Sequence, residues 1–195
     1  MTKLLYDAIR GSSGTADSIQ LHASNQSVTF PGNVTCSGTA TGFGGGKLLN
    51  YATGTTNTQV AITSTTYTDS GLTASITPSA TSSKILVLVD QVARIQTDGG
   101  QGDWGIQLLR DSTVIVVPTT HNSKPMEPFL ENNSESFSYN LRWQFMFVDS
   151  PSSTSSVTYK TQGRVGDTDD SKYIQFQLDR DTNGTSNITL LELAG

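Results

Sequence analysis

The stretch 137-FSYNLRWQFMF-147 decides the fold, because it alternates between apolar and mostly polar side chains over eleven residues. An aromatic side chain or leucine stands at every second position from Phe137 to Phe147. This period of two predicts a β-strand with one buried face. The buried face has two interpretations. It packs in the core of a sandwich, which we favour, or copies of this strand pack together around a threefold axis. The two can hold at different ends of the strand.

Further strands are predicted on both sides of this stretch, separated by turn residues. They comprise 51–67, 72–76, 84–96, 104–109, 114–117, 157–165, 173–178 and 188–193. The strand at 84–96 carries Ile85, Val87 and Val89 on one side and Leu86 and Leu88 on the other, which predicts a central strand buried between two layers. About eight or nine short strands predict an all-β fold, an antiparallel, jelly-roll-like β-sandwich, over residues 47–195.

Residues 1–46 are too poor in apolar side chains to form a core, and we expect an extended N-terminal arm. A short helix is predicted between a Thr2 cap and Gly11, and short alternating stretches follow it. A glycine-rich hinge, 42–46, ends the arm. We expect the arm to become ordered only against other chains. Its candidate anchor and assembly residues are Leu4, Leu5, Ile9, Ile19, Leu21, Val28, Phe30 and Val34.

Composition argues against several functions. Among 195 residues there are 17 acidic and 12 basic side chains, a formal charge of −5, which argues against nucleic acid as a partner. No apolar run is long enough to span a membrane. Two histidines and one cysteine argue against a metal centre, a Ser-His-Asp triad or a catalytic thiolate, so we expect no cofactor and no enzymatic activity. Two acidic loops, 98–103 and 167–170, leave calcium binding open.

Five ordered motifs carry a family resemblance. They are LTASITPSATSSKILV at 72–87, LLRDST at 108–113, FVDSP at 147–151, TYKTQ at 158–162 and ITLLEL at 188–193. Together they resemble a recurrent pattern in β-sandwich proteins of phage virions, especially those of cyanophages and marine phages. The arm segment 28–35 also resembles the N-terminal regions of phage fibre proteins.

The resemblance implies a homotrimeric sandwich displayed on the phage particle, without catalytic residues. Two roles stay open: a capsid cement or decoration protein on the outer shell, bound to the major capsid protein, or a tail-fibre or tailspike-type receptor-binding protein. A host surface glycan is a further candidate partner. The proline-rich loop 118–133 departs most from the resemblance, and its His121, Met126 and Phe129 are candidate outer contact residues.

Overall fold

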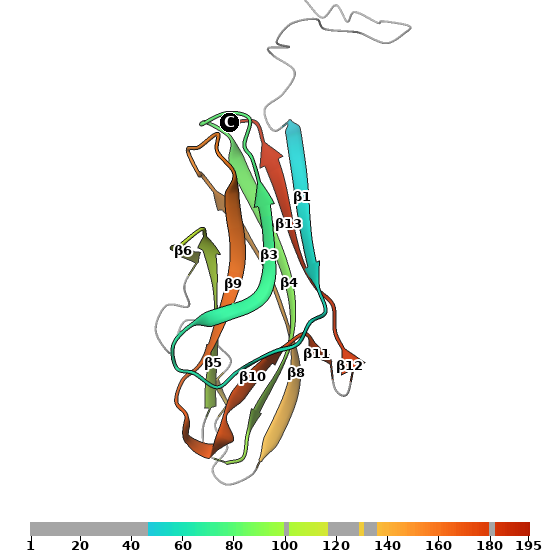
Figure 1. The fold of residues 1–195 in the computed structure, drawn as a ribbon, viewed down its shortest axis with the longest axis vertical. Helices are drawn as coiled ribbons and strands as arrows, with labels where there is room; N and C mark the ends of the chain where they lie inside the picture. The colour runs from blue at the N-terminus through green and yellow to red at the C-terminus, as the bar shows by residue number, and fades with distance from the viewer. Residues whose placement is uncertain (1–46, 100–101, 117–128, 131–135, 180–181) are drawn as a thin grey trace, which may run out of the picture. The chain divides into compact units, whose positions relative to one another are not determined.

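The computed structural model describes residues 47–99, 102–116, 129–130, 136–179 and 182–195 (Figure 1). The predicted arm and all of its anchor residues lie outside this part of the chain, as do His121 and Met126. Phe129 falls in the two-residue strand β7, Phe129–Leu130. Within the described residues, no helix is long and apolar enough to cross a membrane.

The larger sheet is built around one long strand, β4, Lys84–Thr97. Strand β8, Phe137–Asp149, pairs with β4 along its whole length on one side. On the other side, β13 (Ser186–Leu193) pairs with the first half of β4, and β10 (Tyr173–Phe176) pairs with the second half. Strand β1 (Leu48–Thr56) extends the sheet beyond β13, and β2 (Val60–Ile62) extends it beyond β10. All of these pairings are antiparallel.

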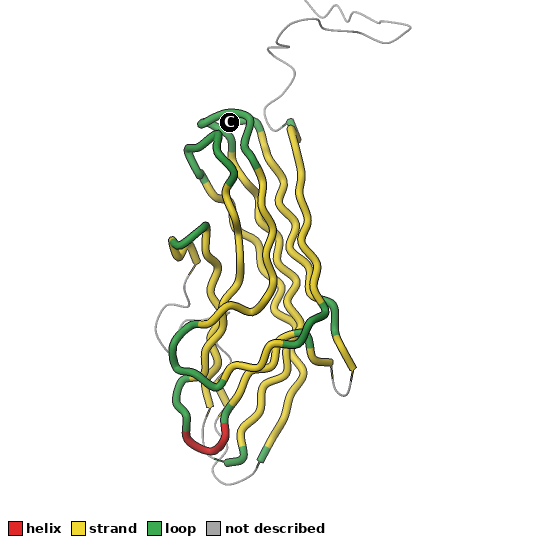
Figure 2. Tube along the Cα trace, viewed as in Figure 1, coloured by secondary structure: helices red, strands yellow, loops and turns green. Residues whose placement is uncertain are grey.

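The smaller sheet has the strand order β3-β9-β5-β6 (Figure 1). Its strands are β3 Thr68–Ile76, β9 Val157–Val165, β5 Gly102–Arg110 and β6 Thr113–Val116, and β7 pairs with β5. A 3₁₀ turn at Asp169–Ser171 precedes β10, and a short hairpin, β11 Leu178–Asp179 with β12 Thr182–Asn183, precedes β13. Figure 2 places the 3₁₀ turn at one end of the sandwich and the C-terminus at the other.

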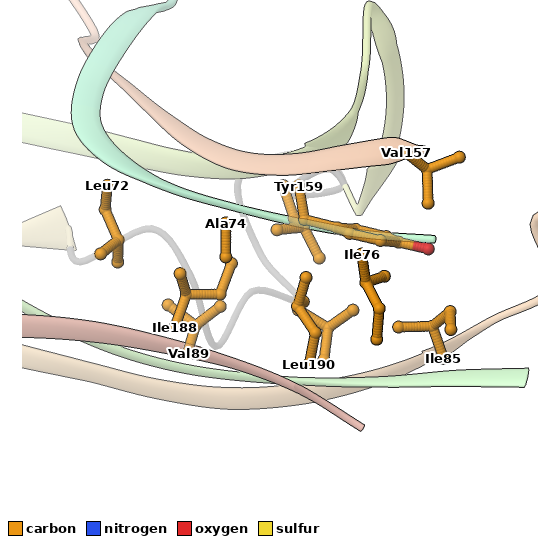
Figure 3. Packing of buried hydrophobic residues seen from close by; sticks show 11 residues of the cluster. Leu72, Ala74, Ile76, Ile85, Val89, Val157, Tyr159, Ile188 and Leu190 are labelled. Carbon is orange, nitrogen blue, oxygen red and sulfur yellow. The ribbon is translucent and has the colours of Figure 1, made fainter. Parts of the chain in front are cut away.

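The core fills the space between the two sheets in two clusters. Figure 3 shows the first, in which Leu72, Ala74 and Ile76 of β3 face side chains of β4 and β13. The second gathers around Trp104 and Phe176, which are fully buried. The alternation of buried and exposed positions in β3 and β9 follows directly from the pleat. These observations confirm an all-β, antiparallel β-sandwich.

A polar network lies within the core. Gln91 of β4 accepts a hydrogen bond from Thr161 Oγ1 (2.6 Å) and donates to Gln177 Oε1 (3.2 Å) and to Ser186 Oγ (3.1 Å). Gln177 in turn donates to the backbone oxygen of Ser70 (2.8 Å). All five residues are fully buried, so the bonds offset the cost of removing these groups from water.

The strand at 137–147 belongs largely to the core, as the favoured interpretation predicts. Trp143 is buried, and Phe137, Leu141, Phe145 and Phe147 pack against the two clusters. Tyr139 departs from the pattern, since 52% of its surface is exposed. The threefold-axis interpretation stays a prediction.

Candidate assembly surface

Residues from three of the motifs meet in a partly buried ion pair. Arg110 of LLRDST donates from Nη1 to both carboxylate oxygens of Asp149 in FVDSP, at 2.9 and 2.8 Å. Tyr159 of TYKTQ donates its hydroxyl to Asp149 Oδ2 at 2.7 Å and is fully buried. Burial and this hydrogen bond raise the pKa of Tyr159 above its ordinary value of 10.0. Three motifs far apart in sequence thus fasten the two sheets together.

A second set of contacts joins the motifs at 72–87 and 188–193; we call this set and the Arg110–Asp149–Tyr159 contacts the two locks. Glu192 Oε1 accepts bonds from the Ser79 backbone (2.6 Å), the Ser79 hydroxyl (2.6 Å) and the Ser83 hydroxyl (2.7 Å). Glu192 is fully buried. Burial raises the pKa of this carboxyl, but the three hydrogen bonds from Ser79 and Ser83 outweigh it and hold the pKa below 4.5. Glu192 and Asp149 lie on either side of Ile85 in one row of the sheet.

These locks give six of the motif residues a structural role within the domain. Each charged or hydroxyl group in them is bonded to another group of the same domain, although the second oxygen of Glu192, Oε2, is buried without a hydrogen-bond partner among the described residues. In the described part of the chain, no three His, Cys, Asp or Glu side chains form a group that could hold a metal ion. The Lys172 ammonium lies 2.6 Å from Asp167 Oδ1 and 3.7 Å from Asp170 Oδ2, where a cation bound by this loop would lie.

The outer face of the larger sheet is mostly apolar over the half that begins at Lys84, whose ammonium bonds Ser150 at the edge of this half. Residues opposite one another on neighbouring antiparallel strands project to the same side of a sheet. One such row runs Tyr51–Leu191–Leu86–Val148, and the next runs Thr53–Thr189–Leu88–Met146, which is apolar over its second half. Met146, Tyr51 and Val148 are 73%, 68% and 54% exposed, and Leu48 at the start of β1 is 51% exposed. We call these two rows, with Leu48 and Leu193, the apolar face.

The other half of the same face carries polar and charged residues, and the change from apolar to polar occurs between the row of Leu88 and the next row, that of Asp90. Asp90, the next outward residue of β4 after Leu88, pairs with Arg142 of β8 (2.5 Å) and accepts from Gln144 (3.3 Å). Beyond it, Arg94 bonds Ser138 across the same two strands. A polar outer face is usual for an antiparallel sandwich. The apolar face is therefore a local departure from that rule.

A second apolar surface adjoins the first along β8. Within the described residues β8 pairs only with β4, so its other side forms an open edge of the sandwich beside β6. A hollow of about 330 Å³ lies at this edge, lined by Val116 of β6, by the apolar Trp143, Phe145, Met146 and Phe147 of β8, and by the polar Arg142 and Gln144 of the same strand. We call it the edge groove. Met146 is shared: it projects from the apolar face and also borders the groove.

The apolar face corrects one sequence interpretation and was otherwise missed. Leu86 and Leu88 were expected to be covered by a second layer, but they lie half-buried on the outer face of the larger sheet. The signal was present, because Tyr51, Met146, Val148 and Leu191 are apolar at positions where an outer face is normally polar. Only the strand register reveals that these residues form one surface.

Among the predicted contact residues, Phe129 is placed in β7, beside Asp103 of β5. The arm residues, His121 and Met126 lie outside the described residues, so their assignments stay predictions. Comparison with protein-family models and with curated proteins finds no match to this chain.

Proposed function

We propose that this chain is a phage virion structural protein: a capsid cement or decoration protein that forms homotrimers on the outer shell and stabilises it. The apolar face is the observation that carries the proposal. It is a contiguous apolar surface of the kind that marks a protein–protein contact. The motifs at 72–87, 108–113, 147–151, 158–162 and 188–193 supply the phage context, through their resemblance to virion sandwiches.

The free energy gained by burying the apolar face can be compared with the free-energy cost of association. Fully burying a large apolar side chain contributes roughly 1.5–3 kcal/mol, and the most exposed members of the face have about half to three quarters of that left to gain. Four such residues supply on the order of 5 kcal/mol, whereas association costs roughly 4–15 kcal/mol. Burial of the apolar face alone therefore about offsets the cost of association, and a stable assembly needs a second contribution.

We assign a second copy of the chain to the apolar face. A cyclic trimer is built from heterologous contacts, in which two different patches of each copy meet. The apolar face and the edge groove are two such patches, and they meet along β8 at Met146. Packing the face of one copy on the groove of the next would cover Tyr51 and Val148 of the first and Phe145 and Phe147 of the second. Repeating this contact three times closes a ring.

The arm, residues 1–46, supplies the contact with the major capsid protein. Its alternating apolar stretches suit an extended segment lying on another surface, and such a segment covers a large area for few residues. The chain leaves the arm at Lys47, next to Leu48 on the apolar face. The trimer contact and the shell contact are therefore neighbours along the chain.

A light-scattering measurement tests the trimer. The full chain is expected to have three times the 20.8 kDa mass of one copy, and Met146→Glu to shift it to the mass of one copy. Ser75→Glu is the matched control, because it adds the same charge at an exposed strand position on the other sheet. A wild-type chain of single-copy mass, or a trimer that survives Met146→Glu, contradicts the assigned contact.

Two further measurements test the virion role. Deleting residues 1–46 removes no residue of either core cluster, so the sandwich is expected to fold but to lose binding to capsids. Decoration of capsids by the truncated chain would refute the anchor. Copy number separates the two roles left open by the resemblance. Hundreds of copies per virion support cement, and a few tens or fewer indicate the tail-fibre receptor-binding role.

A further inference from the structure

We infer that the end of the sandwich opposite the start of β1 carries a binding site for neutral saccharides. A hollow of about 510 Å³ lies there, between loops that follow β2, β4 and β9. Its walls include Thr63, Gln96, Asp98, Thr168, Ser171 and Tyr173. Figure 2 shows that the 3₁₀ turn, which contains Ser171, lies at the end away from the C-terminus. We call this hollow the tip pocket.

The loops around the tip pocket are held in place before any ligand binds. The backbone nitrogen of Asp98 donates to the Asp170 oxygen at 2.8 Å, which ties the loop after β4 to the loop after β9. The Lys172 side chain is only 3% exposed and pins the second loop internally through Asp167 at 2.6 Å. Preorganised walls of this kind reduce the ordering cost of binding.

The polar groups of the pocket are directed along one chain of hydrogen bonds. The Tyr173 hydroxyl donates to Gln96 Oε1 at 2.6 Å, and Gln96 Nε2 donates to Asp98 Oδ1 at 3.2 Å. This fixes the orientation of the Gln96 amide and leaves Asp98 Oδ2 without a hydrogen-bond partner among the described residues. An accepting carboxylate oxygen, an oriented amide and the exposed hydroxyls of Thr168 and Ser171 match the alternating donors and acceptors of sugar hydroxyls. The Tyr173 ring adds an apolar wall.

Charge selects neutral sugars over acidic ones. Asp98 lines the pocket, and Asp167, Asp169 and Asp170 belong to the loop that carries Thr168 and Ser171; among the described lining residues the one ammonium group, Lys172, is already bound to Asp167 and Asp170. A uronic acid, sialic acid or phosphorylated sugar would bring a further negative charge into this field. Neutral hexoses and N-acetylhexosamines carry the same hydroxyl pattern without that repulsion. This chemistry does not depend on the proposed trimer or on the cement role.

A saccharide array tests the inference with the full chain. The probes are immobilised neutral hexosides and N-acetylhexosaminides, with the matching uronic acids and sialic acid beside them. We expect binding to at least one neutral probe and to none of the acidic ones. The Asp98→Asn variant should weaken that binding at least tenfold, because it replaces one accepting oxygen with an NH₂ group. The absence of neutral binding, or equal binding of acidic probes, overturns the inference.

Asp169→Asn is the matched control, since it removes the same charge from the 3₁₀ turn without lining the tip pocket. Its saccharide binding is expected to stay within twofold of the wild-type value. An equal loss in both variants would mean that net charge, not the pocket, decides binding, and would refute the site. A thermal shift with CaCl₂ that Asp98→Asn abolishes, without saccharide binding, would identify a cation site instead and equally overturn the inference. Light scattering on the same samples keeps this result separate from that of the proposed trimer.

Discussion

Removing the hydroxyl of Tyr159 isolates the contribution of the lock formed with Arg110 and Asp149. In Tyr159→Phe the ring remains, so no cavity forms, and only the 2.7 Å hydrogen bond to Asp149 Oδ2 is lost. Hydrogen bonds to charged groups contribute roughly 1.5–3 kcal/mol. At about 2–4 °C per kcal/mol for a domain of this size, we expect the midpoint of thermal unfolding to fall by roughly 3–12 °C. Scanning calorimetry and urea unfolding measure both quantities.

Tyr173→Phe is the matched control for this substitution. It deletes the same atom from a 2.6 Å hydrogen bond whose acceptor, Gln96 Oε1, is neutral. A neutral bond contributes roughly 0.5–1.5 kcal/mol, so the loss in Tyr159→Phe should be about twice as large. If the two variants lose the same free energy of unfolding, Asp149 is not acting as a buried, charged acceptor and the reasoning fails.

Alkaline pH gives an independent signature of the same lock. The pKa of Tyr159 is raised above 10.0 in the folded chain, so the folded state holds the phenol proton more tightly than the unfolded state. The resulting stability is fully present below pH 10 and is lost as pH rises toward the folded pKa. Urea unfolding of the wild type at pH 9 and pH 11 should show this loss, and Tyr159→Phe should show a smaller one. Equal pH dependence in both would contradict the assignment.

Three further predictions concern the core and its locks. Because the pKa of Glu192 is lowered in the folded chain, the ionised carboxylate stabilises the fold above pH 4.5, and this stabilisation is lost as pH falls through the folded pKa. Urea unfolding between pH 3 and 6 should show that the free energy of unfolding of Glu192→Gln depends less on pH than that of the wild type. Gly163→Ala should destabilise the fold by about 1–3 kcal/mol in chemical denaturation, since an added Cβ would come within 2.5 Å of the buried Phe176 ring. Gln91→Leu should lower the free energy of unfolding by roughly 2–5 kcal/mol in the same measurement, because Thr161 and the other buried partners lose their hydrogen bonds to the Gln91 amide.

The fold could be predicted because the residues of each strand alone indicate that strand, without knowledge of its neighbours. The period of two across 137–147 and 157–165 matches β8 and β9, and turn residues mark most ends. Positions where the chain leaves the strand conformation are harder to predict. The predicted strand 173–178 is interrupted at Gln177, which has a φ of 57° and whose amide joins the buried network. The alternation of apolar and polar residues along 173–178 gives no sign of this interruption.

The surfaces could not be predicted, because they depend on register between strands far apart in sequence. Val148 and Tyr51 are nearly one hundred residues apart, and only the pairing of β1, β13, β4 and β8 brings them into one row. The tip pocket likewise depends on a backbone hydrogen bond between Asp98 and Asp170. Each residue alone reads as an ordinary surface or loop position.

The two locks lie at the same end of the sandwich, so the two ends differ in the contacts that hold them. Glu192 and Asp149 flank Ile85 in one inward row, at the end where β4 begins and where the chain enters from Lys47. The apolar face begins on the outer side of these same strands. Removing a partner from the Arg110–Asp149 ion pair or from the buried, hydrogen-bonded Glu192 carboxylate is strongly destabilising, so this end of the sandwich resists local opening. The opposite end holds its loops by other contacts, among them the Asp98–Asp170 backbone hydrogen bond and the Lys172–Asp167 ion pair, so substitutions there leave both locks intact.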